Sequence, residues 1–195
     1  MDDGELRARM AAELPDGLVA HIDRVVTLGD ELARRHGLDV AEVRLAAQGH
    51  DLLRAVADAE LLERAEARGL ELDPVERAAP LMLHGPLAAL ELRERFEVED
   101  EAALDAIWWH TTGHPDYSCE AWAMFMADKV EPSKVSQTPE LRVIRELAGE
   151  SLEAAALVYL EFRLAEAIER GWQVHPMSTL ARNALLARGK GRCRD

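Results

Sequence analysis

His50 and Asp51 stand side by side in an apolar, helix-like stretch, where the folding of a hydrophobic core alone would not place them. A buried imidazole next to a buried carboxylate is destabilising by several kcal/mol unless a partner satisfies both groups. A metal ion is such a partner, because it binds a neutral imidazole and an ionised carboxylate together. Similar groups lie in or beside apolar stretches elsewhere in the chain: His21, His84, His110 and Asp128.

Taken alone, any one of these histidines is more often a hydrogen-bonded core residue than a metal ligand. An apolar core gains nothing from collecting all of them, so the set as a whole predicts a metal site. The remaining histidines, His36, His114 and His175, fall at expected helix ends or in loops, where a solvated or capping histidine needs no further explanation.

Nearly every segment has the periodicity of an amphipathic helix, and no stretch of useful length alternates like a strand. Each candidate histidine falls on its own expected helix. These helices span roughly residues 17–36, a stretch that begins after Asp39 and includes His50, residues 80–96 and residues 99–112. The sequence predicts an all-α fold, a single-domain helical bundle. We expect an N-terminal helical extension (1–16), the main domain (17–188) and a disordered tail (189–195).

The formal net charge of −14 argues against a protein that binds the nucleic-acid backbone, which needs a basic face. It leaves room for a small phosphorylated substrate, because bound divalent cations reverse the local field. No apolar run is long enough for a membrane span, and no signal peptide is evident. Cys119 and Cys193 are far apart, so we expect no disulfide and a cytoplasmic protein.

The order His21, His50-Asp51, His84, His110, Asp128 resembles that of the HD-domain phosphohydrolases, in the subset that holds two metals. The segments His110-Thr111-Thr112-Gly113, Ala127-Asp128-Lys129-Val130-Glu131-Pro132, Leu141-Arg142 and His175-Pro176 followed by Asn183 are similar to those of the YqeK-type HD proteins. Those proteins are symmetrical diadenosine-tetraphosphate hydrolases that use iron.

The resemblance implies the following ligand sets. One metal would be held by His21, His50, Asp51 and Asp128, and Asp51 would bridge to a second metal held by His84 and His110. Nitrogen and oxygen ligands suit iron, manganese or zinc, and the resemblance favours iron. Water on the metal pair would attack the polyphosphate and give two ADP.

A few residues are candidates for binding the phosphates of the substrate. Arg54 stands where the family usually has lysine, and we expect Arg54 and Lys129 to stabilise the transferred phosphate as catalytic residues, although each could equally be a surface residue. Thr111, Lys129 and Lys134 are candidate substrate-binding residues, with helix capping as the alternative for Thr111. Lys134 takes the place of a family arginine that directly follows Glu-Pro. Aromatic residues flank the ligands and could form a wall for a purine, although at least two of them are expected to fill the core: Trp108, Trp109, Tyr117 and Trp122.

Three alternatives remain open. The same metal site would serve a phosphohydrolase of nucleoside or deoxynucleoside monophosphates, or a non-catalytic regulatory module that binds metal or nucleotide. A nucleic-acid binder would have only the short basic segment from Arg182 to Arg194 to rely on. An apolar stripe on the late helix either packs inward or forms the seam of a homodimer: Leu157, Leu160, Leu164 and Ile168.

Overall fold

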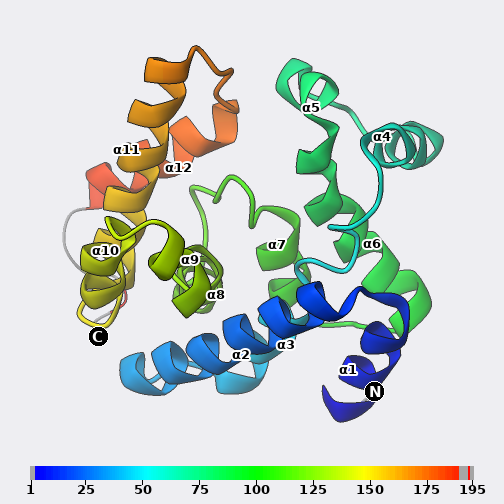
Figure 1. Ribbon diagram of the computed structural model, residues 1–195, viewed down its shortest axis with the longest axis horizontal. Coiled ribbons are helices and arrows are strands. Elements are labelled where there is room, and N and C mark those ends of the chain that lie inside the picture. The colour runs from blue at the N-terminus through cyan, green and yellow to red at the C-terminus, as the bar shows by residue number, and fades with distance from the viewer. Residues whose placement is uncertain (1–2, 189–192, 194–195) are drawn as a thin grey trace.

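The computed structural model describes residues 3–188 and residue 193. These residues form helices and no β-strand, which confirms the all-α fold class (Figure 1). The predicted tail, 189–195, lies outside the described residues except for Cys193. The helices are α1 (Asp3–Glu13), α2 (Asp16–His36), α3 (Val40–Gly49), α4 (Asp58–Ala67), α5 (Pro74–Ala78), the 3-10 helix η1 (Pro80–Leu83), α6 (His84–Phe96), α7 (Glu101–Trp108), α8 (Cys119–Lys129), α9 (Pro132–Gln137), α10 (Leu141–Ala148), α11 (Leu152–Arg170) and α12 (Pro176–Arg188).

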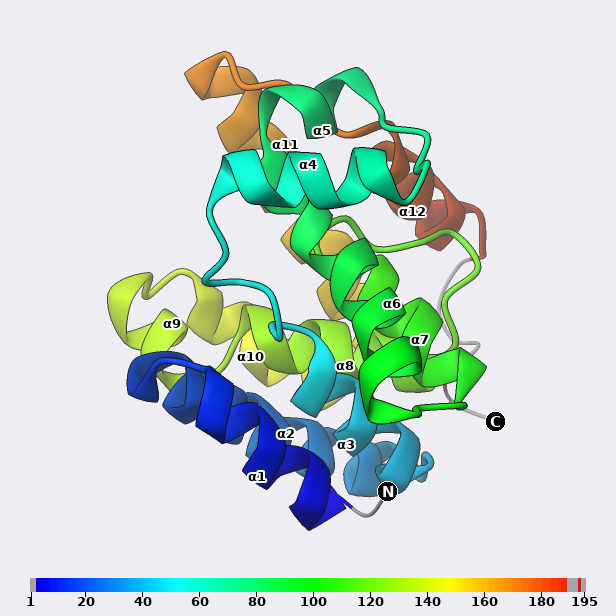
Figure 2. The same ribbon diagram turned by 90° about the vertical axis from the view of Figure 1, so that its right-hand side faces the viewer.

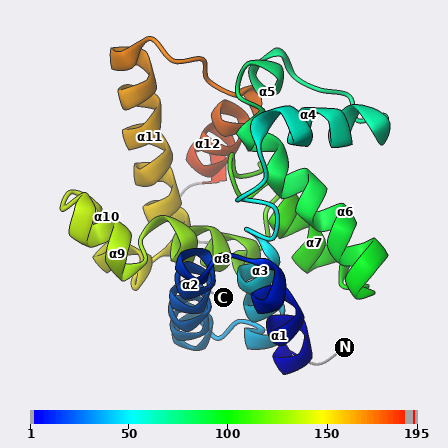
Figure 3. The same cartoon turned by 45° about the vertical axis from the view of Figure 1, so that its right-hand side comes forward.

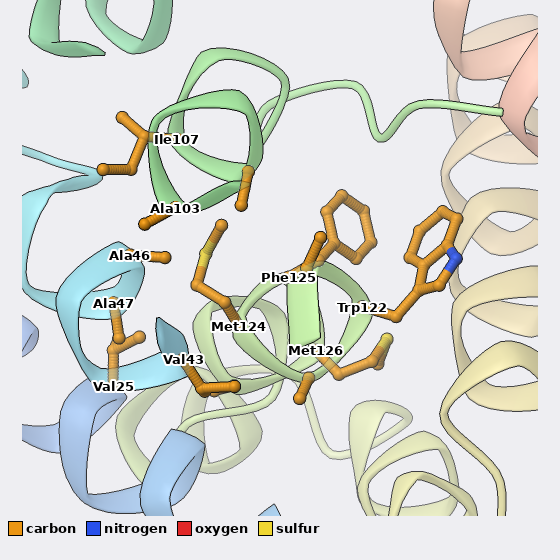
Figure 4. Packing of buried hydrophobic residues seen from close by; sticks show 14 of the residues in the cluster. Val25, Val43, Ala46, Ala47, Ala103, Ile107, Trp122, Met124, Phe125 and Met126 are labelled. Atoms are coloured by element: carbon orange, nitrogen blue, oxygen red, sulfur yellow. The ribbon is translucent and has the colours of Figure 1, made fainter. Parts of the chain in front are cut away.

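Helix α8 lies at the centre of the fold. Every residue from Ala121 to Asp128 is buried, as expected of a helix that is apolar on all sides. The helix contacts α2, α3, α7, α10 and α11. Figure 4 shows Met124 of α8 directed toward the side chains of α3 and α7, and Trp122 directed toward the opposite side. The buried helix α8 is therefore the common packing partner of the helices that surround it.

Helices α2 and α3 form a layer beneath α8 (Figures 1 and 3). Buried residues Ile22, Val25 and Leu32 of α2 follow the helical repeat predicted from the sequence. The helix ends at Gly37, whose φ of 68° is a left-handed conformation that favours glycine, and Asp39 caps the next helix by accepting hydrogen bonds from the backbone N–H groups of its first turn. This turn sets the start of α3, and His50 directly follows the last residue of that helix.

Two groups of helices rise on the other side of α8. Helices α4, α5 and α6 form one group, and α11 with α12 forms the other (Figures 2 and 3). The capping box predicted at Asp73 is present and starts α5. Ser151 caps α11, and Gly171 ends it in a left-handed conformation. These two groups supply the opposite walls of the cleft described below.

The N-terminal helix belongs to the same core as the rest of the chain. Leu6 and Met10 of α1 are buried in the main apolar cluster, and Arg7 forms an ion pair with Asp23 of α2. The division at residue 16 between an extension and a main domain stays a prediction. Within the described residues, no helix is long and apolar enough to cross a membrane.

The prediction that the cysteines stay unpaired is wrong. Cys119 and Cys193 form a disulfide that spans 74 residues of sequence. A large separation along the chain does not prevent pairing, because α12 returns toward the start of α8. The disulfide also removes the argument from unpaired thiols on which the prediction of a cytoplasmic location rested.

The apolar stripe of α11 does not form one continuous seam. Leu160 is buried, and both Leu160 and Leu164 line the cleft, whereas Ile168 is 77% exposed. The stripe thus divides between the interior, the cleft and the surface.

Candidate active site

The Asp51 carboxylate lies between two pairs of histidines. Its Oδ2 atom is 3.5 Å from Nε2 of His21 and 3.5 Å from Nε2 of His50. Its Oδ1 atom is 3.1 Å from Nε2 of His84 and 3.6 Å from Nε2 of His110. Two groups of potential metal ligands therefore share Asp51: His21, His50 and Asp51, and Asp51, His84 and His110.

Three of these histidines stand at the ends of helical segments rather than in the middle of helices. Helix α3 ends at Gly49, so His50 and Asp51 lie in the turn that follows, and His110 lies in a turn beyond the end of α7. The predictions of continuous helices through His50 and through residues 99–112 are wrong at these points. His84 follows η1 and opens α6.

The reason lies in the carbonyl groups that a helix end leaves without intrahelical partners. The Nδ1 atom of each histidine lies close to the carbonyl oxygen three residues earlier: 2.7 Å for His50 and Ala47, 2.5 Å for His84 and Leu81, and 2.7 Å for His110 and Ile107. A carbonyl only accepts, so Nδ1 carries the proton and donates it. Each Nε2 therefore presents a lone pair toward Asp51, as a metal ligand must.

Two observations fit bound cations. The Nε2 atoms of His84 and His110 are 2.9 Å apart, and two lone pairs at that distance repel unless a cation lies between or beside them. The buried Nε2 of His50 has no hydrogen-bond partner among the described residues. The nitrogen and oxygen donors, with no thiolate among them, suit a first-row divalent metal.

Gly85 allows the second histidine pair to form. A Cβ atom there would lie 2.9 Å from the carbonyl oxygen of Trp108, 3.0 Å from that of Ile107 and 3.0 Å from Nδ1 of His110. Helix α6 can approach the end of α7 this closely only without a side chain, and this approach brings His84 beside His110.

His21 is oriented by a side chain rather than by a carbonyl. Its Nδ1 lies 3.4 Å from Oε1 of Glu131, which is 1% exposed. Arg24 donates a hydrogen bond of 2.8 Å to Oε2 of the same carboxylate. Burial acts to raise the pKa of Glu131, but the hydrogen bonds from Arg24 and the Ser133 amide hold it below the ordinary value. This positioning role was not predicted, although Glu131 stands in the Ala-Asp-Lys-Val-Glu-Pro segment and follows Asp128 by three residues.

Asp128 faces the first histidine pair and two lysines. Its Oδ1 is 3.4 Å from Nε2 of His21 and 3.6 Å from Nε2 of His50. Lys129 donates a hydrogen bond of 2.6 Å to Oδ2, and Lys134 donates one of 2.6 Å to Oδ1. Although burial opposes it, these positive charges hold the pKa of Asp128 well below its usual range, so the carboxylate is ionised at neutral pH.

The surroundings keep two of the ligands, His110 and Asp51, in the protonation states that metal binding requires. Burial lowers the pKa of His110 to about 3, so its imidazole is neutral. Burial acts to raise the pKa of Asp51, but the surrounding histidines hold it well below the usual range. Burial would lower the pKa of His50, yet the charges of Asp51 and Asp128 raise it, so a proton and a metal compete for this Nε2.

A cleft of about 870 Å³ opens over Asp51, His84, His110 and Asp128. Its lining includes the predicted cationic and polar residues Arg54, Thr111, Lys129 and Lys134. It also includes Tyr159, Arg163 and Trp172 from α11 and its end, which the sequence analysis did not identify. The hydrophobic periodicity of α11 is that of an ordinary amphipathic helix, and it does not indicate that one face of the helix borders a cleft.

None of the four aromatic residues proposed as a purine wall lines this cleft. Tyr117 and Trp122 are buried, as expected for at least two of the set, and the Tyr117 hydroxyl donates a hydrogen bond to the Ala106 carbonyl. Trp108 and Trp109 border a separate groove of about 260 Å³. His175 is a capping histidine, one of the two roles expected for it, because its Nδ1 accepts a hydrogen bond of 3.1 Å from the Met177 amide in the first turn of α12. It is also largely buried and lines the cleft, which was not predicted.

Comparison with known proteins matches residues 18–133 to the HD domain family. A Halalkalibacterium halodurans protein named bis(5'-nucleosyl)-tetraphosphatase, symmetrical, is 28% identical over 195 residues, which cover 97% of this chain and 100% of the relative. A Bacillus subtilis protein with the same name is 25% identical over 96% of this chain and 99% of its own length. A Clostridium acetobutylicum crystal structure, described as a predicted HD superfamily hydrolase involved in NAD metabolism, shares the fold with a TM-score of 0.89 and 24% identity, covering 96% of this chain and 98% of that one.

Proposed function

We propose, since this chain belongs to the HD domain family, that it is a metal-dependent hydrolase that cleaves diadenosine tetraphosphate symmetrically into two ADP molecules. The matches to proteins named symmetrical tetraphosphatases extend over nearly the whole length of this chain. The observation that carries the proposal is the position of the Asp51 carboxylate, with one oxygen toward each histidine pair, at the floor of a cleft with cationic walls.

Asp51 would bridge two divalent metals in this proposal. His21, His50 and Asp128 would complete the first set of ligands, and His84 and His110 the second. Bound divalent cations lower the pKa of a coordinated water by several units and thereby supply a nucleophile near neutral pH. We favour iron, since mixed imidazole and carboxylate ligands suit it, and manganese shares the same ligand preferences.

The chain's own residues would position the tetraphosphate. Lys129 and Lys134 donate hydrogen bonds to Asp128, and they would be available to bind phosphate oxygens if that carboxylate held a metal. Arg54 lies on the cleft wall and is exposed, so its guanidinium is free to bind phosphate oxygens in a bidentate manner. Thr111 also lines the cleft and would donate its hydroxyl to phosphate. These donors would take up the negative charge that grows on the leaving oxygen.

Cleavage adds water to one of the two central phosphorus atoms. The bond from that phosphorus to the central bridging oxygen breaks, and the oxygen leaves with the other half of the substrate. Each half is then ADP, and one water is consumed for each substrate molecule.

Product analysis tests the proposal. Protein purified without oxygen is analysed for metal content and incubated with diadenosine tetraphosphate, and the products are separated by chromatography. ADP as the sole product is expected. Production of ATP and AMP would refute symmetrical cleavage, and turnover of nucleoside monophosphates in place of the tetraphosphate would favour the alternative phosphohydrolase. A protein that binds nucleotide without turnover would be the regulatory module.

The variant Asp51→Ala separates catalysis from folding. We expect it to lose activity and both metals while keeping the helical circular dichroism spectrum. Asp58→Ala changes an exposed carboxylate at the start of α4 and is expected to keep metal and activity. Full metal content in Asp51→Ala would contradict the bridging role.

A further inference from the structure

The cleft continues beyond the metal ligands along one face of α11. Tyr159, Arg163 and Ala167 follow one another at intervals of four residues and all line the cleft. Tyr159 marks the inner end, because its ring contacts Phe125 of the central helix α8, with the two ring centroids 5.8 Å apart. Ala167 lies two helical turns farther out, roughly 12 Å along the axis at 1.5 Å per residue.

The chemistry of the cleft changes along this line. Lys129 and Lys134 donate hydrogen bonds to Asp128, and Arg163 lines the cleft one helical turn beyond Tyr159. The outer part is mostly apolar, with Ala167 and Trp172 on the α11 side. The opposite wall, from α5 and η1, contributes Val75, Ala78 and Met82. A nucleoside diphosphate has the same division, with charge at one end and a planar ring at the other.

Trp172 is held in a fixed position at this outer end. Gly171 ends α11 with a φ of 67°, and the Trp172 amide donates a hydrogen bond of 2.8 Å to the Ala167 carbonyl. The Arg170 guanidinium lies 4.8 Å from the indole centroid and covers one face of the ring. The side chain is nevertheless 49% exposed and lines the cleft, so indole surface is available to a ligand.

We propose that this outer part of the cleft is the nucleoside subsite, with Trp172 as the stacking surface for the base and Arg163 as the ligand of the phosphate between the nucleoside and the metal centre. The identity of the ligand rests on the proposed function. Arg163 is paired with Glu166 on the next turn of α11, and we expect phosphate to replace that carboxylate as its partner.

Equilibrium binding of ADP and of inorganic pyrophosphate to the metal-loaded protein tests both assignments. Trp172→Ala is expected to weaken ADP binding about 5- to 100-fold, the range for loss of one stacked base, and to leave pyrophosphate binding unchanged. Trp172→Phe should keep most of the ADP affinity. Arg163→Ala is expected to weaken both ligands about 10-fold, because both carry the phosphates that Arg163 would bind.

Matched controls come from the same part of the molecule. Ile168→Ala removes an exposed apolar side chain of α11 that does not line the cleft, and Arg182→Ala removes a cation that pairs with Glu161 outside it. Both should bind ADP like the wild type. Unchanged ADP affinity in Trp172→Ala, or an equal loss of affinity for ADP and pyrophosphate, would overturn the nucleoside subsite. Unchanged pyrophosphate affinity in Arg163→Ala would overturn the phosphate assignment.

The outcomes for the proposed function and for the nucleoside subsite can be told apart. Wild-type protein that binds ADP through Trp172 but releases no ADP from diadenosine tetraphosphate would refute the function and support the subsite. Wild-type protein that yields two ADP, with Trp172→Ala binding ADP normally, would support the function and refute the subsite.

Discussion

Replacing Gly85 with alanine tests whether the close approach of α6 and α7 builds the second histidine pair. The new Cβ atom would meet two backbone carbonyl oxygens, those of Trp108 and Ile107, at 2.9 and 3.0 Å. Backbone atoms cannot rotate away as the end of a flexible side chain can. The two helices must therefore separate, and the His110 ring, 3.0 Å from the same Cβ, must move with them.

The expected loss of stability follows from two opposing effects. Overpacking of this kind destabilises a protein by about 1–3 kcal/mol. Alanine in place of glycine within a helix returns about 0.5–1 kcal/mol. We expect a net loss of about 1–2 kcal/mol, which lowers the Tm of a chain of this size by roughly 2–8 °C. Displacement of His110 should also lower the affinity for the second metal by about 10- to 100-fold.

The chain contains a matched control. Gly17 is the second residue of α2, as Gly85 is the second residue of α6, and a Cβ atom at Gly17 would meet nothing within 4 Å. Gly17→Ala should leave the metal content unchanged and keep or slightly raise the Tm. Thermal unfolding and metal analysis of both variants make the comparison. A Gly85→Ala protein with wild-type Tm and a full metal complement would refute the steric reasoning.

Further predictions concern the orientation of His21, the acidic surface and the disulfide. Glu131→Gln should lower metal affinity about 10- to 100-fold in chelator competition, because the amide holds the His21 ring less well than the carboxylate does; unchanged affinity would contradict this role. Burial, followed by the charge of Glu120 and other nearby acids, raises the pKa of Glu42 from 4.5 to about 7, so the folded state holds this proton more tightly than the unfolded chain does and loses stability as the pH rises between these values. Glu42→Gln should therefore gain stability relative to the wild type between pH 4.5 and pH 8, by about 1 kcal/mol after solvent screening, and a pH-independent difference in unfolding free energy would refute the shift. Cys193→Ser should lower stability by up to about 4 kcal/mol, from the chain entropy of the opened loop, and should abolish the effect of reductant on the Tm that we expect for the wild type.

Helices and their ends were largely predictable because their signals are local. The periodicity of α2, the glycine after His36, the Asp39 cap and the Asp73 capping box all depend on residues within one or two turns. The breaks after Gly49 and Trp108 were not predicted. At those points a histidine side chain bonds a carbonyl of its own segment, and hydrophobic periodicity carries no information about that choice.

The candidate ligands were identified from the sequence because buried imidazoles and carboxylates are conspicuous among apolar neighbours. The side chains that surround them are less conspicuous. Glu131, at the start of α9, contacts His21 of α2. Arg163 and Trp172 border the cleft because the C-terminal part of α11 lies opposite α5 and η1. Cys193 reaches Cys119 across 74 residues. Such proximities depend on how the helices pack, and no local pattern encodes them.

The hydrogen bonds from the histidines to main-chain carbonyls affect how the site can change during evolution. A carbonyl oxygen is present whatever amino acid a codon specifies, so a single substitution at Ala47, Leu81 or Ile107 leaves the anchor in place. The anchor of His21 is a side chain, and one codon change removes it. Of the four histidines, His21 is thus the one whose orientation a single substitution can change most directly. The other three keep their hydrogen-bond acceptor when the residue that supplies the carbonyl is substituted.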